Sequence, residues 1–414
     1  MKTINGKRNR ADLERLATRG ALDLARAEKT AAKIVNDVRK RGDSALLRYA
    51  RKFDGFEGKN LRVSQQEIDA AWQQVTPDFR HALETAATNI RRFCEWQSPQ
   101  EWIREVQPGV KLGQLVRAID AVGCYVPGGR HPLPSTLLMT VIPAQIAGVA
   151  RISVVSPRPA PETLAAAALL GVKEFYAIGG AQAIAALAYG TKTIAKVNKI
   201  VGPGNAFVTA AKKLVAFDCS IDMLAGPTEA LVVSENGNAA FIAADLVAQA
   251  EHDPDALPIF VTSNKKLGEQ VIAETKRQSE SNRVAREALK RNGYVIVSES
   301  PADSMRVANL LAPEHITVPS HSALSEVHSA GSAFVGDFSP QAAGDYASGP
   351  NHVLPTGACA RFRGGLSVND FVKLITVQEL SARGLGTIAR EVTTLARAEG
   401  LLAHAQSIAM RTGA

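Results

Sequence analysis

Residues 151–207 read RISVVSPRPAPETLAAAALLGVKEFYAIGGAQAIAALAYGTKTIAKVNKIVGPGNAF. Short β-branched runs at 151–155, 174–178 and 199–201 alternate here with Ala- and Leu-rich segments that are long enough to form helices. Strict alternation of strand and helix is typical of βαβ units, in which crossover helices join parallel strands. The segment therefore predicts an α/β fold built on a parallel sheet.

The same alternation continues on both sides of this segment. A strand is expected at 122–126 before it, and further strands at 230–234, 258–262, 294–298, 315–319 and 332–338 after it, each separated from the next by a helical pattern. The chain has 414 residues, 46% apolar and 21% charged, which is more than one hydrophobic core usually organises. We expect two α/β domains, and we exclude a mainly disordered chain.

The two ends of the chain show different sequence patterns from the α/β segments. Residues 24–53 place apolar side chains at intervals of three and four, which predicts an amphipathic helix and a helical N-terminal region. Residues 339–365 are rich in Gly, Pro and Ala and predict a long loop, and loops of this length tend to be functional. From about residue 372 the pattern returns to helix. The expected division is a helical arm (1–29), a larger α/β domain (30–120 with 235–371), a second α/β domain (121–234) and a helical tail (372–414).

Composition argues against several classes of protein. Of the net charge of +8, the surplus lies in residues 1–60, with 16 Lys and Arg against 8 Asp and Glu, at helical spacing and without interleaved aromatic residues. Such an end is more typical of a solvated arm than of a nucleic-acid-binding surface. No apolar run approaches the roughly 20 residues of a membrane span, and the charged N-terminus predicts a cytoplasmic protein. The four cysteines show no C-x-x-C spacing, so neither disulfides nor a thiolate zinc site is expected.

Glycine turns follow three of the expected strands, at 127–129, 179–180 and 202–204. Each is either a tight turn or a place where backbone N–H groups face a ligand, and three such turns in one domain favour a ligand. The dinucleotide fingerprint G-x-G-x-x-G is incomplete, because Phe207 stands where the third glycine belongs. Tyr125, near the end of the first of these strands, either stacks on a cofactor ring or covers the core.

Two pairs of polar residues lie where chemistry could occur. Gln249 and His252 are three residues apart near the end of a predicted helix and share one face, which suits a metal ion, although a histidine there can also be satisfied by the helix dipole. Glu314 and His315 begin an extended run and could transfer protons or activate water. The alternative is an ordinary strand start, because neighbours in a strand point in opposite directions.

Further candidates are dispersed along the C-terminal third. Asp345 and His352 lie in the predicted loop, and Glu399 and His404 lie in the predicted tail. Taken singly, each of them is explained more simply by loop polarity or by a solvated helix face. Together with Gln249 and His252 they could form a nitrogen and oxygen shell that suits zinc without thiolates, but their spacing alone does not assemble it.

Nine separated motifs give the chain a specific resemblance. They are YVPGGRHPLPSTLLM, IGGAQAIAALAYGT, KIVGPGNAFV, IDMLAGPTE, LVAQAEHDPD, LLAPEHITV, GDYASGPNHVLPT, VQELS and AEGLLAHA. In this order and spacing they resemble the histidinol dehydrogenase family of histidine biosynthesis over nearly the whole chain. The resemblance implies two incomplete Rossmann-like domains and a zinc-containing homodimer that exchanges its helical tails. It also implies NAD-dependent four-electron oxidation of L-histidinol to L-histidine through a bound aldehyde.

The resemblance also assigns roles to residues. It implies that the zinc ligands are Gln249, His252, Asp345 and His404, that Glu314 and His315 are catalytic, and that NAD contacts Tyr125, Gln182 and Asn205. The implied substrate contacts are Thr228, His352 and Glu399, together with His315 and the four metal ligands. His315 would accept the alcohol proton, and Glu314 would take a proton from the water that attacks the aldehyde. The tail residues would complete the site of the partner subunit.

One departure and three alternatives accompany this resemblance. Thr228 stands where many relatives have serine, which keeps the hydroxyl. Related dehydrogenases of other small alcohols share the Glu-His pair, so a different alcohol is the first alternative. A zinc hydrolase that uses Glu314 without a nicotinamide and a nucleic-acid-binding module are the others. We expect a small-molecule substrate and a second copy of the chain as partners, and neither nucleic acid nor a membrane.

Overall fold

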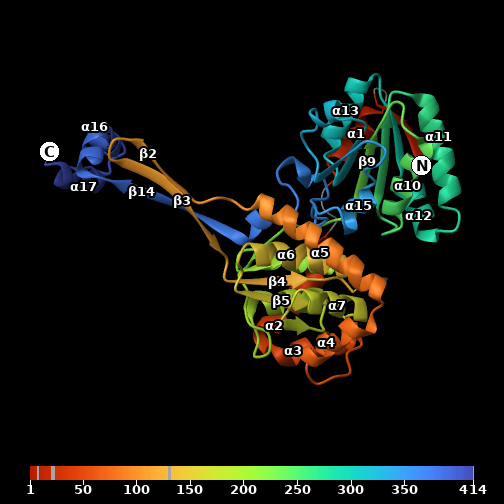
Figure 1. The fold of residues 1–414 in the computed structure, drawn as a ribbon, viewed down its shortest axis with the longest axis horizontal. Helices are drawn as coiled ribbons and strands as arrows, with labels where there is room; N and C mark the ends of the chain where they lie inside the picture. The colour runs from red at the N-terminus through yellow and green to blue at the C-terminus, as the bar shows by residue number, and fades with distance from the viewer. Residues whose placement is uncertain (7–8, 20–23, 129–131, 414) are drawn as a thin grey trace.

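The structure is a computed structural model that describes residues 1–6, 9–19, 24–128 and 132–413. Two α/β bodies, each built on one parallel sheet, lie side by side, and a long arm carries the C-terminus away from both (Figure 1). The two parallel sheets confirm the predicted fold class. Gly129, the last residue of the first predicted glycine turn, lies outside the described residues.

A parallel six-stranded sheet forms the first body, in the order β1-β11-β10-β9-β12-β13. Its strands are β1 (Lys2–Asn5), β9 (Glu229–Val233), β10 (Leu257–Thr262), β11 (Tyr294–Val297), β12 (His315–Val318) and β13 (Ser332–Val335). One face is covered by α1 (Arg10–Ala17) and α13 (Pro301–Leu311), and the other by α10 (Ala239–Ala250) and α11 (Lys265–Gln278). Two further helices complete this body, α12 (Arg283–Asn292), which packs on α10, and the short α14 (His321–Leu324).

A parallel five-stranded sheet forms the second body, in the order β6-β5-β4-β7-β8. Its strands are β4 (Ala121–Tyr125), β5 (Arg151–Val155), β6 (Glu174–Tyr176), β7 (Lys199–Val201) and β8 (Ser220–Ile221). The crossover helices α6 (Pro134–Ile146) and α7 (Pro161–Leu169) cover one face, and α8 (Gly180–Tyr189) and α9 (Ala206–Val215) cover the other. These Ala-rich helices are apolar on all sides because a second layer of helices buries their outer faces.

That second layer consists of the N-terminal helices, which changes the expected division of the chain. The layer contains α2 (Ala25–Arg41), α3 (Asp43–Asp54), α4 (Gln65–Gln74) and α5 (Pro77–Gln97). α2 packs on α8 and α9, whereas α4 and α5 pack on α7 and α6, so residues 30–97 share their cores with the five-stranded sheet and not with the larger body. The amphipathic pattern identified these helices but could not say which sheet they cover.

Three local differences have simple causes. Gly42 has a positive φ of 53° and divides the single helix predicted over 24–53 into α2 and α3. β1 lies within the predicted helical arm, and its four residues are too few to show a period. β9 falls in the range expected for the second domain but lies at the centre of the six-stranded sheet, between β10 and β12.

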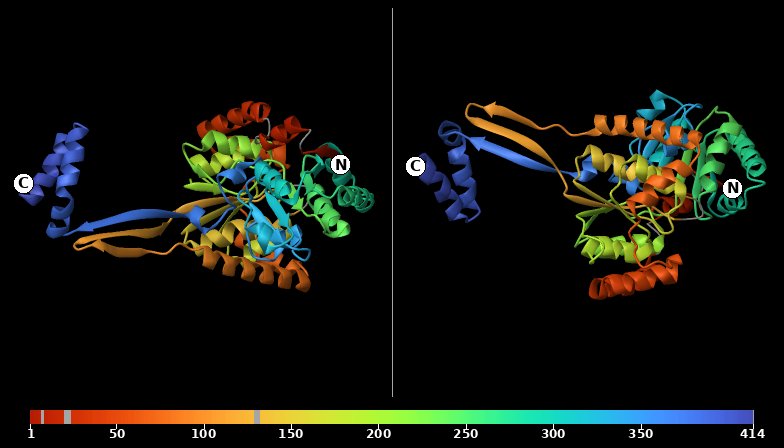
Figure 2. Two further views of the ribbon diagram at one scale, coloured as in Figure 1. Left: turned by 90° about the horizontal axis from the view of Figure 1, so that it is seen from above. Right: turned by 60° about the horizontal axis from the view of Figure 1, so that its bottom comes forward.

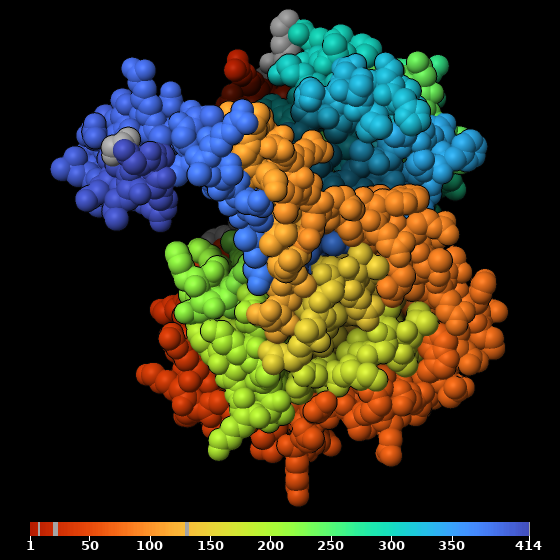
Figure 3. Space-filling model, turned by 60° about the vertical axis from the view of Figure 1, so that its left-hand side comes forward, coloured from red at the N-terminus to blue at the C-terminus, as the bar shows by residue number. Residues whose placement is uncertain are grey.

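The arm contains an antiparallel three-stranded sheet and two helices. β2 (Trp102–Gln107) and β3 (Val110–Ala118) form a hairpin, and β14 (Val372–Leu380) pairs along the whole length of β3. α16 (Ala382–Ala398) and α17 (Leu402–Thr412) pack together at the far end of the arm, away from both bodies (Figures 2 and 3). The predicted purely helical tail is therefore wrong for residues 372–380, whose β-branched sequence forms a strand because β3 is available as a partner.

The segment predicted as a long loop is mostly irregular but holds or adjoins three short helical pieces. Two of them, α15 (Gln341–Tyr346) and the 3₁₀ turn Cys359–Arg361, lie within residues 339–365, and the 3₁₀ turn Val368–Phe371 follows just after. No helix in the part of the chain that the structure describes is long and apolar enough to cross a membrane.

Candidate functional site

A cavity of about 440 Å³ lies between the two bodies. The five-stranded sheet contributes residues that follow β4 and β7, at the carboxyl ends of its strands, as expected for such sheets. The six-stranded sheet contributes Thr228 and Glu314, which immediately precede β9 and β12, and His315, the first residue of β12. Unlike the five-stranded sheet, this sheet faces the cavity with the amino ends of its strands.

Glu314 is buried and tightly held at this edge. Its Oε2 accepts hydrogen bonds from the Thr228 hydroxyl at 2.7 Å and from the Glu229 N–H at 2.8 Å. Burial raises the pKa of Glu314 to about 7, although neighbouring His315 and the two hydrogen bonds oppose the shift. A carboxyl group with this pKa can exchange a proton near neutral pH.

His315 lies beside Glu314, although neighbours in an extended segment were expected to point apart. Its Nδ1 is 3.1 Å from the Glu229 carbonyl and 3.6 Å from the Glu314 carboxylate, and its Nε2 is 3.6 Å from Asp345 Oδ1. The backbone contact places the ring proton on Nδ1 and leaves Nε2 toward Asp345. Burial alone would lower the pKa of His315, but the Glu314 and Asp345 carboxylates outweigh it and raise the pKa to about 9.

Three of the four predicted metal ligands line the same cavity. Gln249 is in the last turn of α10, His252 is in the turn that follows, and Asp345 is in α15. The Gln249 amide donates to Asp345 Oδ2 at 3.2 Å, and its oxygen is 3.1 Å from the Thr228 hydroxyl. Burial would raise the pKa of Asp345, but His315, His352 and His252 outweigh it and lower the pKa, so this carboxylate stays ionised.

The donor set fits a divalent metal ion in chemistry but is incomplete within one chain. An amide oxygen, an imidazole and a carboxylate are ligands that zinc, manganese or cobalt accept. Within the described ranges, no group of three or more His, Cys, Asp and Glu side chains is arranged to hold a metal. The fourth predicted ligand, His404, is exposed on α17 at the end of the arm, and Glu399 is exposed where α16 ends (Figure 2). The structure therefore does not bring these two residues to the cavity of their own chain.

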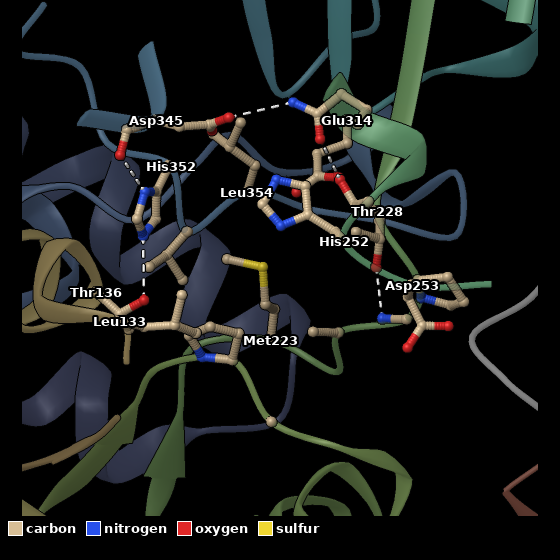
Figure 4. A pocket seen from close by; sticks show the side chains of 18 of the residues that line it. Leu133, Thr136, Met223, Thr228, His252, Asp253, Glu314, Asp345, His352 and Leu354 are labelled. Carbon is tan, nitrogen blue, oxygen red and sulfur yellow. Dashed lines mark hydrogen bonds between the residues drawn. The ribbon is translucent and has the colours of Figure 1, made fainter. Parts of the chain in front are cut away.

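His352 joins the two bodies across the cavity. Its Nδ1 is 2.8 Å from the Asp345 carbonyl, and its Nε2 is 3.3 Å from the hydroxyl of Thr136 on α6. Figure 4 shows Asp345 and Glu314 on one side of the cavity and Thr136, Leu133 and Met223 on the other. Burial lowers the pKa of His352, which favours a neutral ring. A small polar molecule in this cavity would contact both bodies at once.

The three predicted NAD contacts line a second cavity, of about 390 Å³, on the five-stranded body. Tyr125 is buried and its hydroxyl accepts a hydrogen bond from the Gly180 N–H at 3.1 Å, so the ring covers the core while its edge reaches this cavity. The Gln182 amide is 3.4 Å from the Asp54 carboxylate. Asn205 caps the N-terminus of α9 and lines both cavities, so the two cavities adjoin at this residue.

The atypical glycine turn after β7 has a packing reason. Gly202 has a φ of 108°, and a Cβ there would lie 2.1 Å from the Tyr125 carbonyl oxygen. Only glycine permits this approach of the two strands. The turn leads into α9 through Asn205, whose side chain accepts hydrogen bonds from the N–H groups of Phe207 and Val208.

Sequence reasoning missed several residues that shape these sites. Thr136 lies within the motif YVPGGRHPLPSTLLM but was given no role, because it is a helix residue among apolar neighbours, and Asp54 ends an amphipathic helix. Glu229 ends the motif IDMLAGPTE, just before the strand expected at 230–234, and was given no role, although it contacts both Glu314 and His315. An acidic residue directly before the apolar run 230–233 was the signal that could have drawn attention to it, and the structure buries this side chain.

Comparisons with known proteins agree with one another. The family model described as histidinol dehydrogenase matches residues 17–412. A histidinol dehydrogenase of Methanothermobacter thermautotrophicus is 45% identical over 412 residues, covering 96% of each chain, and one of Geobacter sulfurreducens is 43% identical over 415 residues, covering 97% of each. The crystal structure of histidinol dehydrogenase from Elizabethkingia anophelis superimposes with a TM-score of 0.93 at 37% identity, covering 99% of this chain and 98% of that one.

Proposed function

The chain belongs to the histidinol dehydrogenase family and is an oxidoreductase that acts on an alcohol, and we propose that it oxidises L-histidinol to L-histidine in two NAD-dependent steps through bound L-histidinaldehyde. The observation that carries the proposal is the convergence of Glu314, His315, Asp345 and His352 on one cavity that adjoins a second cavity at Asn205. The first cavity suits an imidazole substrate, and the second suits the cofactor.

We assign the proton transfers to the two buried groups beside Thr228. His315 accepts the proton of the substrate hydroxyl, and Tyr125, Gln182 and Asn205 would hold NAD, which when bound supplies the hydride acceptor. Glu314 then removes a proton from the water that attacks the aldehyde carbon, and the hydrate is oxidised in the second step. His315 Nδ1 and Glu314 Oε2 are 3.6 Å apart, so the two groups interact through their charges although they share no hydrogen bond.

Gln249, His252 and Asp345, with His404 of the partner subunit, would hold the divalent ion, which is zinc in this proposal. When bound, the ion orients the imidazole and amine of the substrate, since zinc itself has no redox chemistry. His352, Thr228 and the partner subunit's Glu399 complete the substrate contacts. Removing the metal with a chelator should abolish activity, and zinc, manganese or cobalt should restore it.

The position of the arm supports a homodimer with exchanged tails. Its strands and helices expose many large apolar side chains, among them Trp102, Ile103, Val106, Leu374, Leu395, Leu402 and Met410. Such a surface needs a partner, and the tail carries two predicted site residues away from their own cavity. A cytoplasmic location stays a prediction.

The stoichiometry of the reaction tests the proposal. Purified protein with limiting histidinol and excess NAD should form two NADH and one histidine per histidinol. One NADH per substrate, or activity only on a different small alcohol, would instead favour a related dehydrogenase. Stabilisation against thermal unfolding by NAD alone is expected as well, because binding to the folded state stabilises it.

A further inference from the structure

A buried ion pair lies directly behind Glu314 and His315, outside the cavity. Arg19, just after α1, contacts the Glu229 carboxylate with both Nε at 2.8 Å and Nη2 at 2.6 Å. The side chains are 14% and 5% exposed. Neither residue is among those that line the cavity, so neither contacts a molecule bound there.

Glu229 contacts the catalytic pair through three different groups. Its N–H donates to Glu314 Oε2 at 2.8 Å, its carbonyl oxygen is 3.1 Å from His315 Nδ1, and its carboxylate accepts from the Glu314 N–H at 3.3 Å. The position of this one residue therefore sets the orientation of the Glu314 carboxylate and the tautomer of His315. The carboxylate also accepts from the Gly357 N–H at 2.8 Å, which ties down the loop that follows His352.

Arg19 is itself firmly anchored. Its Nη1 donates to the Leu16 carbonyl at 2.6 Å and to the Leu311 carbonyl at 2.8 Å, at the C-terminal ends of α1 and α13. These contacts leave the guanidinium plane facing Glu229 in a bidentate arrangement, the geometry that fixes a carboxylate most strongly. A negative charge so close to Glu314 would otherwise disfavour the ionised form of Glu314, and the guanidinium compensates it.

We propose that Arg19 and Glu229 form a positioning pair that holds Glu314 and His315 in their reactive orientation and balances the charge behind them. The inference rests on the proposed catalytic roles of these two residues. It adds two residues, one in the N-terminal segment and one at the start of β9, that act through Glu314 and His315 without touching the substrate.

Two single variants perturb the pair in opposite senses. Glu229→Gln keeps the backbone contacts with Glu314 and His315. Its amide NH₂ group, however, is a donor and replaces an oxygen that accepts from Arg19, Gly357 N–H or Glu314 N–H. The variant also leaves the positive charge of Arg19 without a counter-charge. Arg19→Met leaves the Glu229 carboxylate unbalanced. We expect kcat with histidinol to fall about 10- to 100-fold in each, as for other residues that orient a site from behind, with KM changed less than about threefold.

The pH profile separates a positioning role from loss of stability. Glu314 faces His315, Glu229 and, through Glu229, Arg19. In Glu229→Gln the extra positive charge should move the acid limb of kcat to lower pH, and in Arg19→Met the extra negative charge should move it to higher pH. Arg19→Lys, which keeps the charge, should retain more activity than Arg19→Met and serves as the milder variant if the others do not fold.

Arg361→Ala is the matched control. Arg361 donates to the carbonyls of Ala17 and Leu310, beside those that Arg19 contacts, but makes no contact with Glu229. This variant should lower the melting temperature and leave kcat and its pH profile unchanged. If the Arg19 and Glu229 variants lower kcat only in step with lost folded protein, or move the acid limb in the same direction, the pair is structural and the inference is overturned.

The assay of the wild-type enzyme distinguishes failure of the positioning role from failure of the proposed function. A wild-type enzyme that forms two NADH per histidinol, with variants that keep its kcat, overturns the positioning role alone. A wild-type enzyme that does not oxidise histidinol overturns the proposed function and this inference with it.

Discussion

The Thr228 hydroxyl lies 2.7 Å from Oε2 of Glu314 and 3.1 Å from Oε1 of Gln249, so one small side chain joins the proposed water-activating carboxylate to a proposed metal ligand. The hydroxyl donates to only one of them at a time, and the ionised carboxylate is the stronger acceptor. Thr228, which lines the cavity, therefore helps to orient the same Glu314 oxygen that the Glu229 N–H contacts.

Two variants of Thr228 should distinguish the contribution of its hydroxyl to kcat from that of its side-chain shape. Thr228→Val keeps the shape but loses a hydrogen bond to a charged group, so we expect kcat to fall about tenfold or more. Thr228→Ser keeps the hydroxyl and should keep activity within about threefold. Steady-state kinetics of the two variants check this, and equal losses in both would contradict a role for the hydroxyl.

Glu314→Gln should uncouple the two oxidation steps. The amide cannot accept a proton from water, so attack on the aldehyde should slow by about 100-fold or more, whereas removal of the alcohol proton by His315 remains possible. In a single turnover we expect one NADH per site in a fast phase and the second much later. A variant that forms both NADH at one slowed rate would assign Glu314 a role in the first step as well.

The pH dependence should differ between the two steps. Glu314, with a pKa raised to about 7, and His315, with a pKa raised to about 9, both act as bases and must be deprotonated to work. Activity therefore falls as pH drops through each value. Oxidation of histidinaldehyde should lose activity below about pH 7, whereas oxidation of histidinol should still rise toward pH 9. Identical midpoints for the two substrates would contradict these roles.

Two variants of Asn205 should distinguish its effect on NAD binding from its effect on the stability of α9. Its side chain caps α9 by accepting hydrogen bonds from the N–H groups of Phe207 and Val208. Asn205→Asp keeps the cap and adds a negative charge where the NAD diphosphate would approach, so the KM for NAD should rise several-fold without loss of thermal stability. Asn205→Ala should lower the free energy of unfolding by about 1 kcal/mol. A KM for NAD that is unchanged in Asn205→Asp would remove Asn205 from the cofactor site.

Periodicity predicted the parts of the fold that are local. The strands at 151–155 and 199–201 have the predicted bounds, because β-branched runs between glycine turns have few alternatives. The position of β14 in the arm could not be predicted, since its partner β3 lies more than 250 residues away and nothing in residues 372–380 specifies it. Likewise, the stripe on α2 predicted a buried face but not the sheet that buries it.

In the candidate site, too, residues in recognisable local patterns could be predicted, and residues joined by long-range contacts could not. Glu314, His315, Gln249 and His252 were selected because each occupies a recognisable place near the end of a helix or the start of a strand. Glu229 and Arg19 were not selected, because a salt bridge between residues 210 positions apart leaves no trace in either local sequence. The family resemblance supplied residues that reasoning from spacing alone could not assemble, such as His404 on an arm that ends far from the cavity.

The exchange of tails can be tested by mixing inactive variants. Gln249→Ala should disable the cavity of its own chain, and His404→Ala should disable the cavity of the partner subunit. When the two variants are unfolded and refolded together in equal amounts, half of the dimers are mixed. In each mixed dimer one cavity combines both lesions and the other carries neither. About one quarter of wild-type activity should therefore return. Mixing His404→Ala with Glu399→Ala is the control, because both lesions lie in the tail and every mixed cavity then receives one. No recovery in the first mixture, although mixed dimers form, would mean that each tail serves its own chain, and the exchange would be wrong.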